Sequence, residues 1–357
     1  MTTPEHIAPV CLHFGICGGC AYQDIAPADY RALKRKTVVD ALARQGVRDA
    51  VVREIAEVAP MTRRRAVFKL EKRGGAVTIG FHAARSHDIV DMRECHVLTP
   101  ALTALVQQLR ALMAGVLREG EAAEVHATEA DNGFDLSLHW KRGNDVALNA
   151  QFPRAIAKLA RVTAGGETLV ELAAPTVRFG KADVKLPVEA FLQPTRDGEA
   201  ALLGCVREAV GRAKAVADLF SGCGTFSLPL AERARVHAVE RDGAMLEALA
   251  AAARMTPGLK PVTTEKRDLF KHPLSPAELA RFDAVVLDPP RAGAAAQIAQ
   301  LAQSKVGRIA YVSCDPVSFA RDARVLSEGG YAMGPVLPVD QFLWSSHIEL
   351  VAAFARP

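Results

Sequence analysis

The spacing of hydrophobic and polar positions divides the chain into two parts of different texture. In the first part, residues 27–46 and 102–117 carry apolar side chains at helical spacing, which predicts two amphipathic helices. Residues 64–92 alternate as a β-meander does, and residues 125–140 indicate a hairpin around an Asp-Asn-Gly turn. This combination of helices and antiparallel strands predicts an α+β domain.

From about Val188 the pattern changes to strands that alternate with helices. This alternation is typical of an α/β fold with a doubly wound, mostly parallel sheet. We therefore predict two domains, residues 1–187 and residues 188–357. The strands of the second domain are expected at 215–220, 236–239, 261–264, 284–287 and 309–312, with a closing pair at 331–339 and 348–354.

A glycine loop follows the first of these strands. Gly222 and Gly224 are only two of the three glycines of a dinucleotide fingerprint. Glu240, at the end of the next strand, is placed to accept hydrogen bonds from both hydroxyls of a ribose, and Asp218 is placed to hold an amino group. A nucleoside joined to an amino acid is S-adenosylmethionine, which we predict as the cofactor; an NAD-type oxidoreductase is the weaker alternative.

Two reactive side chains follow later strands. Cys314 stands where a strand ends and Pro316 starts a helix, and ligands of open α/β sheets gather outside such strand ends. Asp288 heads the loop Asp288-Pro-Pro-Arg291 after the preceding strand, where methyltransferases commonly hold the target base. A carboxylate here, with a thiol one strand later, indicates methylation of carbon, and Cys314 is the candidate nucleophile.

Three cysteines crowd the amino terminus among glycines that let the backbone curl. Cys11, Cys17 and Cys20 need a fourth ligand, and Cys95 is the best candidate. Four soft thiolates suit either zinc or an iron-sulfur cluster, and their spacing does not decide between the two. His13 and His96 are weaker candidates for the fourth position.

Charge and hydropathy narrow the class of protein further. The net charge is only +4, but residues 31–73 hold thirteen Lys or Arg against five acids, and these bases include Lys34 and the run from Arg63 to Arg65. Such an excess suits an RNA phosphate backbone, with a solvated helix face as the alternative. The sequence lacks a signal peptide and any apolar run of about eighteen residues, so we expect a soluble, cytoplasmic protein with no membrane partner.

Taken together, these motifs resemble the RNA 5-methyluridine methyltransferase family, most closely its iron-sulfur members that modify 23S rRNA. The resemblance implies a Rossmann-like class I methyltransferase domain behind an amino-terminal domain that carries a 4Fe-4S cluster. It also implies that Cys314 attacks the base, that Glu349 removes the C5 proton, and that a cofactor site is lined by Gln193, Phe220, Gly222, Glu240 and Asp288. The matching segments are the four cysteines, Phe191-Leu-Gln193, Asp218-Leu-Phe-Ser-Gly-Cys-Gly, Val239-Glu240, Leu287-Asp-Pro-Pro-Arg291, Val312-Ser-Cys-Asp-Pro316 and Ser346-His-Ile-Glu349.

The sequence departs from the family pattern at three positions. Thr225 and Thr195 stand where the family usually has Asn, which would shift cofactor contacts. Asp315 replaces an Asn beside the nucleophile, and its carboxylate is expected to raise the pKa of the thiol. No oligonucleotide-binding barrel precedes Cys11, so RNA contact is expected from the cluster domain and the basic segment.

The predicted chemistry follows from the weak nucleophilicity of uracil C5. A thiolate must first add to C6, and a carboxylate must later remove the C5 proton so that the adduct can eliminate. We therefore predict a monomeric RNA uracil-5 methyltransferase acting on an unstacked uridine, most simply in 23S rRNA. The alternatives are a tRNA uridine-5 enzyme, a cytosine-5 methyltransferase and a non-catalytic iron-sulfur RNA-binding protein.

Overall fold

The structure is a computed structural model that describes residues 4–142 and 150–356. These residues form two compact units. The first comprises residues 1–26, 59–177 and 343–346, and the second comprises residues 27–58, 178–342 and 347–357. The chain therefore passes between the units several times, whereas the sequence suggested a single cut after residue 187. The predicted α/β class is confirmed.

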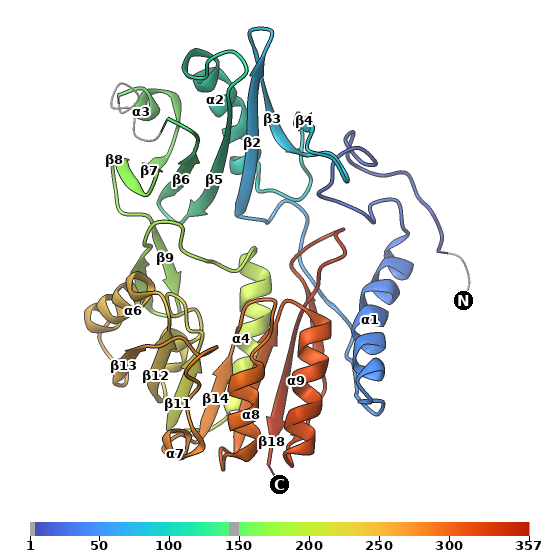
Figure 1. Ribbon diagram of the computed structural model, residues 1–357, viewed down its shortest axis with the longest axis vertical. Coiled ribbons are helices and arrows are strands. Elements are labelled where there is room, and N and C mark those ends of the chain that lie inside the picture. The colour runs from blue at the N-terminus through green and yellow to red at the C-terminus, as the bar shows by residue number, and fades with distance from the viewer. Residues whose placement is uncertain (1–3, 143–149, 357) are drawn as a thin grey trace. The chain divides into compact units, whose positions relative to one another are not determined.

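The first unit is built on a mostly antiparallel sheet with one parallel strand pair, and the hairpin and meander patterns predict its antiparallel part. Helix α2 (Pro100–Val116) begins at Thr99, whose side chain accepts a hydrogen bond from the amide of Leu102. The helix lies against β2, β3 and β5 (Figure 1). Its leucines belong to the same buried core as the side chains of these strands. In the described part of the chain the sheet has seven strands, in the order β4 (Ile89–Asp91), β3 (Ala76–His82), β2 (Arg65–Arg73), β5 (Ala122–Ala130), β6 (Gly133–His139), β7 (Leu159–Ala164) and β8 (Glu167–Glu171).

The second unit has the doubly wound sheet that the strand and helix alternation predicts. Its central strands are parallel, and β18 (Glu349–Ala355) is antiparallel to both of its neighbours in the main strand order. Within the described residues the sheet has nine strands. The main order is β1 (Ala56–Glu57), β17 (Leu337–Asp340), β18, β15 (Arg308–Ser313), β14 (Ala284–Leu287), β11 (Ala215–Leu219), β12 (Arg235–Glu240) and β13 (Val262–Lys266), and β16 (Ala332–Met333) pairs with β18.

Helices cover both faces of this sheet because successive strand residues point to opposite sides. One face, with Leu219 and Leu287, packs against α1 (Pro27–Arg44), α8 (Ala295–Gln303) and α9 (Pro316–Glu328). The other face, with Val216 and Val286, packs against α4 (Arg196–Val210). The remaining elements in the described residues are α6 (Gly243–Met255), the short helices α3 (Phe152–Ala155), α5 (Ser227–Leu230) and α7 (Pro276–Leu279), and a separate strand pair, β9 (Thr176–Phe179) and β10 (Ala182–Lys185).

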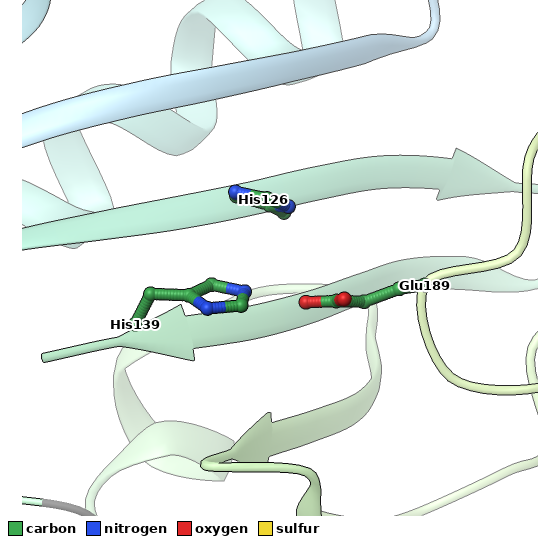
Figure 2. Close-up of side chains that lie close together, drawn as sticks. All are labelled: His126, His139 and Glu189. Atoms are coloured by element: carbon green, nitrogen blue, oxygen red, sulfur yellow. The ribbon is translucent and has the colours of Figure 1, made fainter.

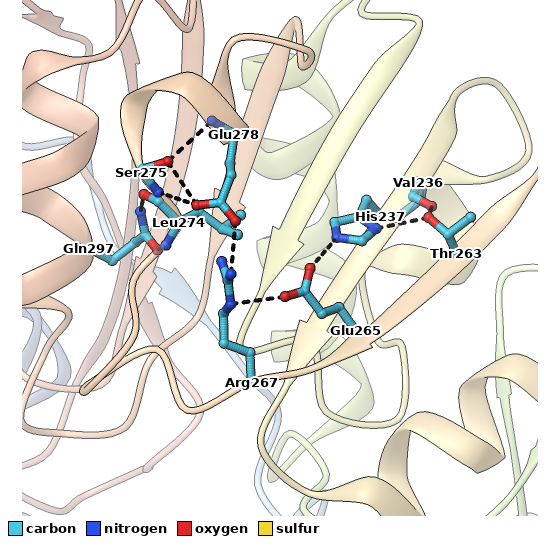
Figure 3. Close-up of polar contacts among 9 residues, drawn as sticks. All are labelled: Val236, His237, Thr263, Glu265, Arg267, Leu274, Ser275, Glu278 and Gln297. Carbon is cyan, nitrogen blue, oxygen red and sulfur yellow. Dashed lines mark hydrogen bonds and ion pairs between the residues drawn. The ribbon is translucent and has the colours of Figure 1, made fainter.

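A polar network closes the β13 edge of the sheet (Figure 3). His237 Nε2 lies 3.0 Å from Glu265 Oε2, and the guanidinium of Arg267 joins Glu265 to Glu278 at 2.8 Å each. Glu278 also completes a capping box with Ser275 at the start of α7. Charged pairs of this kind protect an edge strand from pairing with another chain.

Helix α1 occupies a place that the charge count did not predict. It belongs to the second unit, where Val38 and Leu42 lie in the core. Lys34 is 1% exposed and its Nζ donates to Asp340 Oδ1 at 2.7 Å. Lys34 is therefore an internal ion-pair partner and is unavailable to a phosphate. No helix in the described residues combines the length and hydropathy needed to cross a bilayer.

Candidate active site

The predicted nucleophile and base lie at the same edge of the second unit's sheet. Strand β15 ends at Ser313, which pairs with Leu350 of the antiparallel strand β18. The next position along each strand is Cys314 on one side and Glu349 on the other. Strand β14 runs parallel to β15 and ends directly before Asp288. The sheet topology therefore brings Cys314, Glu349 and Asp288 to one carboxyl edge, as predicted for a reacting centre.

Two glutamine side chains join the two carboxylates in a chain of hydrogen bonds. Gln341 Nε2 donates to Glu349 Oε2 at 3.1 Å and to Gln193 Oε1 at 2.7 Å. Gln193 Nε2 in turn donates to Asp288 Oδ2 at 3.0 Å. Gln341 was missed by sequence reasoning; its one signal is a polar residue that directly follows the buried strand β17.

Burial sets the protonation of this site. It raises the pKa of Glu349 to about 7, which the hydrogen bond from Gln341 opposes. Burial and the nearby charge of Glu349 raise the pKa of Asp288 well above its ordinary value. Burial, followed by the charges of Glu349 and Asp288, raises the pKa of Cys314 to about 12. The isolated site thus favours a neutral thiol beside two carboxyl groups whose pKa values burial raises.

The glycine loop after β11 has the backbone shape of an anion or nucleotide cradle. Phe220, Gly222 and Gly224 have φ angles of 62°, 53° and 96°, and such a conformation costs energy for a bulky residue such as Phe220. Glu240 Oε2 accepts from the amide of Gly222 at 3.2 Å, which fixes the carboxylate beside the loop. A Cβ added to Gly222 would meet nothing within 4 Å, so the space above the loop is open.

Unpaired polar atoms show that this loop fits a ligand. Asp218 is fully buried, and its Oδ2 accepts from Ser227 Oγ at 2.5 Å. Burial raises its pKa to about 7. In the described structure, Asp218 Oδ1 and Ser221 Oγ are buried without a hydrogen-bond partner, a costly state that a bound polar group would relieve. The residues present therefore fit a polar cofactor at this loop.

Two of the three residues that depart from the family pattern cap helices. Asp315 caps α9, since its Oδ1 accepts from the amides of Val317 and Ser318. The sequence had assigned it to the pKa of the thiol, but the nearby charges that raise that pKa belong to Glu349 and Asp288. Thr195 likewise caps α4 by accepting from Gly198.

The four predicted ligand cysteines lie close enough to interact electrostatically. All four are half-buried in the first unit. Burial raises the pKa of each thiol, that of Cys20 to about 12, and the charges of Cys95, Cys17 and Cys11 raise it further. These effects place the four sulfurs in one region of the unit, although the loop and Cys95 are about seventy-five residues apart in sequence. Within the described residues, no three of these sulfurs lie within 4.8 Å of one another.

Backbone amides point at three of these sulfurs, a feature typical of thiolates that bind iron or zinc. The amide of Gly19 donates to Cys17 Sγ at 3.5 Å. His13 is engaged elsewhere, because its Nε2 accepts from the amide of Arg93 at 3.1 Å. The backbone amides of His13 and Phe14 donate to Cys11, and those of Val97 and Leu98 donate to Cys95.

A pair of closely spaced imidazoles on the same unit, with ring planes tilted by 33°, was not singled out from the sequence. His126 on β5 and His139 on β6 have ring centroids 4.3 Å apart (Figure 2). Glu189, drawn in the same figure, belongs to the other compact unit. Two imidazoles supply fewer ligands than the three or four that zinc sites use, so the pair by itself defines no metal centre.

The run from Arg63 to Arg65 differs from the exposed patch that its charge suggested. Arg64 is 3% exposed. Burial lowers the pKa of Arg63, and the charges of Cys95 and Cys20 oppose that change, so Arg63 lies beside two of the four thiols. Burial also lowers the pKa of Arg65, to about 10. The side chains of these three arginines are therefore mostly buried inside the unit.

Comparison with known proteins agrees with the geometry. A family model described as tRNA (Uracil-5-)-methyltransferase matches residues 180–356. The chain is 43% identical to an RNA methyltransferase of Brucella suis, over 99% of this chain and 86% of the relative. It is 32% identical to the 23S rRNA (uracil(1939)-C(5))-methyltransferase RlmD of Halomonas elongata, over 99% and 77% of the two chains.

A solved structure shares the fold of the whole chain. The tRNA (uracil-54, C5)-methyltransferase of Pyrococcus abyssi, in complex with S-adenosyl-L-homocysteine, aligns with a TM-score of 0.76 at 22% identity. The alignment covers 99% of this chain and 86% of that structure.

Proposed function

Because the chain belongs to the family of S-adenosylmethionine-dependent RNA (uracil-5-)-methyltransferases, we propose that it methylates C5 of a uridine in 23S rRNA through a covalent adduct between Cys314 and C6. The observation that carries the mechanism is the register of β15 and β18, which sets the thiol of Cys314 and the carboxylate of Glu349 side by side. A nucleophile and a proton acceptor at one edge are what the two-stage chemistry needs.

The first stage needs a thiolate. With a pKa near 12, the thiol of Cys314 is neutral at physiological pH, so it must lose its proton as it attacks C6. The nearby carboxylate of Asp288, whose pKa burial raises well above its ordinary value, is suited to accept that proton, which leaves Glu349 available for the C5 proton. Addition of sulfur to C6 moves an electron pair onto C5, which then takes the methyl group.

The second stage restores the aromatic base. Glu349 accepts the C5 proton, the electron pair of the C5–H bond forms the C5–C6 double bond, and the C6–Sγ bond breaks to release the thiolate of Cys314. A pKa of about 7 lets Glu349 return that proton to solvent. Asp288 and Gln193 lie on the cofactor side of the same hydrogen-bond chain.

The cofactor, when bound, supplies an electrophilic methyl group on a sulfonium. We assign its binding to the glycine loop at Phe220 and Gly222, where Gly222 borders open space and Glu240 is held by backbone amides. Gln193 and Asp288 complete the predicted set. The unpaired Asp218 Oδ1 and Ser221 Oγ at the same loop support this assignment.

We also propose that Cys11, Cys17, Cys20 and Cys95 hold a 4Fe-4S cluster. Four mutually interacting thiols, with backbone amides aimed at three of them, support a soft metal centre. Protein purified without air should be brown, with broad absorbance, and Cys95→Ser should lose both the colour and about half or more of the iron. A colourless protein that holds one zinc instead would contradict the cluster.

The choice of 23S rRNA rests on the relative from Halomonas elongata, which is named for its activity on that RNA. The family model and the structure from Pyrococcus abyssi are named for tRNA, so a tRNA uridine is the competing target. Mass spectrometry of ribosomal and transfer RNA from a strain lacking the gene should reveal one missing 5-methyluridine, in 23S rRNA if the proposal is correct.

The covalent mechanism is tested by two substitutions with different outcomes. Cys314→Ala should lose both methyl transfer and the protein–RNA adduct seen on a denaturing gel. Glu349→Gln should still attack and methylate, but elimination should stall and a methylated adduct should accumulate. Methylation by Cys314→Ala would refute the covalent route, and normal turnover by Glu349→Gln would assign proton removal to another residue.

A further inference from the structure

We propose that Gln341 is a positioning residue that holds Glu349 in its proton-accepting orientation and links it to the cofactor side of the site. The inference rests on the proposed role of Glu349 and concerns a residue outside the predicted set. Gln341 is 1% exposed, and its amide nitrogen donates both to Glu349 Oε2 and to Gln193 Oε1. One amide group therefore contacts both Glu349, the proposed base, and Gln193, a proposed cofactor-binding residue.

The orientation of the Gln341 amide follows from its neighbours. Its nitrogen faces two oxygens, so the opposite orientation would bring oxygen against the carboxylate of Glu349 and the carbonyl of Gln193. The arrangement observed suits the ionised form of Glu349, which is the form that accepts a proton. With Oε2 occupied by Gln341, Oε1 is the oxygen that we expect to take the proton from C5.

Lys34 binds the residues on both sides of Gln341. Its Nζ donates to the side chain of Asp340 at 2.7 Å and to the carbonyl of Phe342 at 3.4 Å. The same ammonium also donates to the carbonyl of His347, two residues before Glu349. A single buried cation therefore ties together the strand ends that carry the amide and the carboxylate, and such support limits the error in their relative position.

Gly198 of α4 supplies the space that Gln341 occupies. A Cβ added there would lie 2.5 Å from Gln341 Oε1 and 2.8 Å from Gln341 Cβ. Since real contacts are longer than this, an alanine at 198 must displace Gln341, and it also crowds Thr195 Oγ1, 2.8 Å from the added Cβ. Gly204, six residues later on the same helix, has no neighbour within 4 Å of its added Cβ and is the matched control.

The test measures kcat against pH from about 6 to about 9, with saturating cofactor and total RNA from a strain lacking the gene. A hydrogen bond to the ionised carboxylate lowers the pKa of Glu349. Its loss in Gln341→Met should therefore raise that pKa and move the acidic limb of the profile upward by about one pH unit. Below the shifted limb, the methylated protein–RNA adduct should accumulate.

Two further comparisons separate positioning from general damage. Gly198→Ala should shift the limb in the same direction as Gln341→Met, while Gly204→Ala should keep the profile of the unmodified enzyme. Gln193→Met breaks the link to Asp288 but leaves the bond from Gln341 to Glu349, so it should raise the cofactor KM without moving the limb.

An acidic limb unchanged in both Gln341→Met and Gly198→Ala would overturn the inference, as would an equal shift in Gln193→Met. If Gln341→Met does not fold, judged by its melting curve, Gly198→Ala against Gly204→Ala decides alone. Methylation by Cys314→Ala would instead overturn the proposed mechanism, so the two failures are distinguishable.

Discussion

Glu349 shows how a reactive residue opposes the stability of its own fold. Burial raises its pKa from an ordinary 4.5 to about 7. A carboxyl whose pKa is higher in the folded than in the unfolded chain favours folding most below the unfolded value. That contribution is lost as the pH rises from about 4.5 through about 7, because the folded chain must then hold a buried charge.

Replacing this carboxyl by its neutral isostere should therefore stabilise the protein in a pH-dependent way. We expect Glu349→Gln to melt a few degrees above the unmodified protein at pH 8, consistent with a gain on the order of 1–3 kcal/mol, and to show little difference at pH 4. Thermal unfolding monitored by circular dichroism at both pH values measures the effect.

Glu278 provides a control of opposite sign. Hydrogen bonding to Arg267 lowers its pKa to about 2, so Glu278→Gln should lower the melting temperature at pH 8. If Glu349→Gln lowers the melting temperature at pH 8 as Glu278→Gln does, the buried carboxylate of Glu349 does not destabilise the fold.

At the scale of elements, periodicity was sufficient for most of the fold. Helix α1 and the meander of β2 to β4 lie within about three residues of their predicted bounds. Alternation alone also placed Cys314 and Asp288 at strand ends. Helix α5 spans only Ser227–Leu230, because the chain turns after Leu230 to begin β12 at Arg235.

Charge was the less reliable guide, because a count of charges carries no information about burial. Lys34 seemed available to RNA, yet its partner Asp340 lies 306 residues away in sequence and both are buried. Gln341 was overlooked for a related reason, since its partner Gln193 is 148 residues away. Long-range pairs of this kind follow from the packed fold and leave no periodic pattern.

At the scale of the molecule, the compact units interleave along the chain. Residues 27–58 belong to the same unit as the methyltransferase sheet, although more than a hundred residues of the other unit separate them in sequence. They contribute Val38 and Leu42 to its core, the edge strand β1 to its sheet, and Lys34 to the support of Gln341. A catalytic fragment chosen at the change of sequence texture would lack all of these.

We therefore expect a fragment of residues 188–357 to fail as an independent domain. Removal of α1 would expose the core that Val38 and Leu42 cover and leave Asp340 buried without its cation, and an unpaired buried charge costs about 3–5 kcal/mol. The fragment should bind a hydrophobic dye and unfold without a sharp transition.

Fusing residues 27–58 through a flexible linker to residues 178–357 should restore cooperative melting, because the fused chain contains nearly the whole compact unit. Cooperative unfolding of 188–357 alone, at the melting temperature of the full chain, would mean that α1 is a surface addition and that the core contacts of Val38 and Leu42 contribute little to folding.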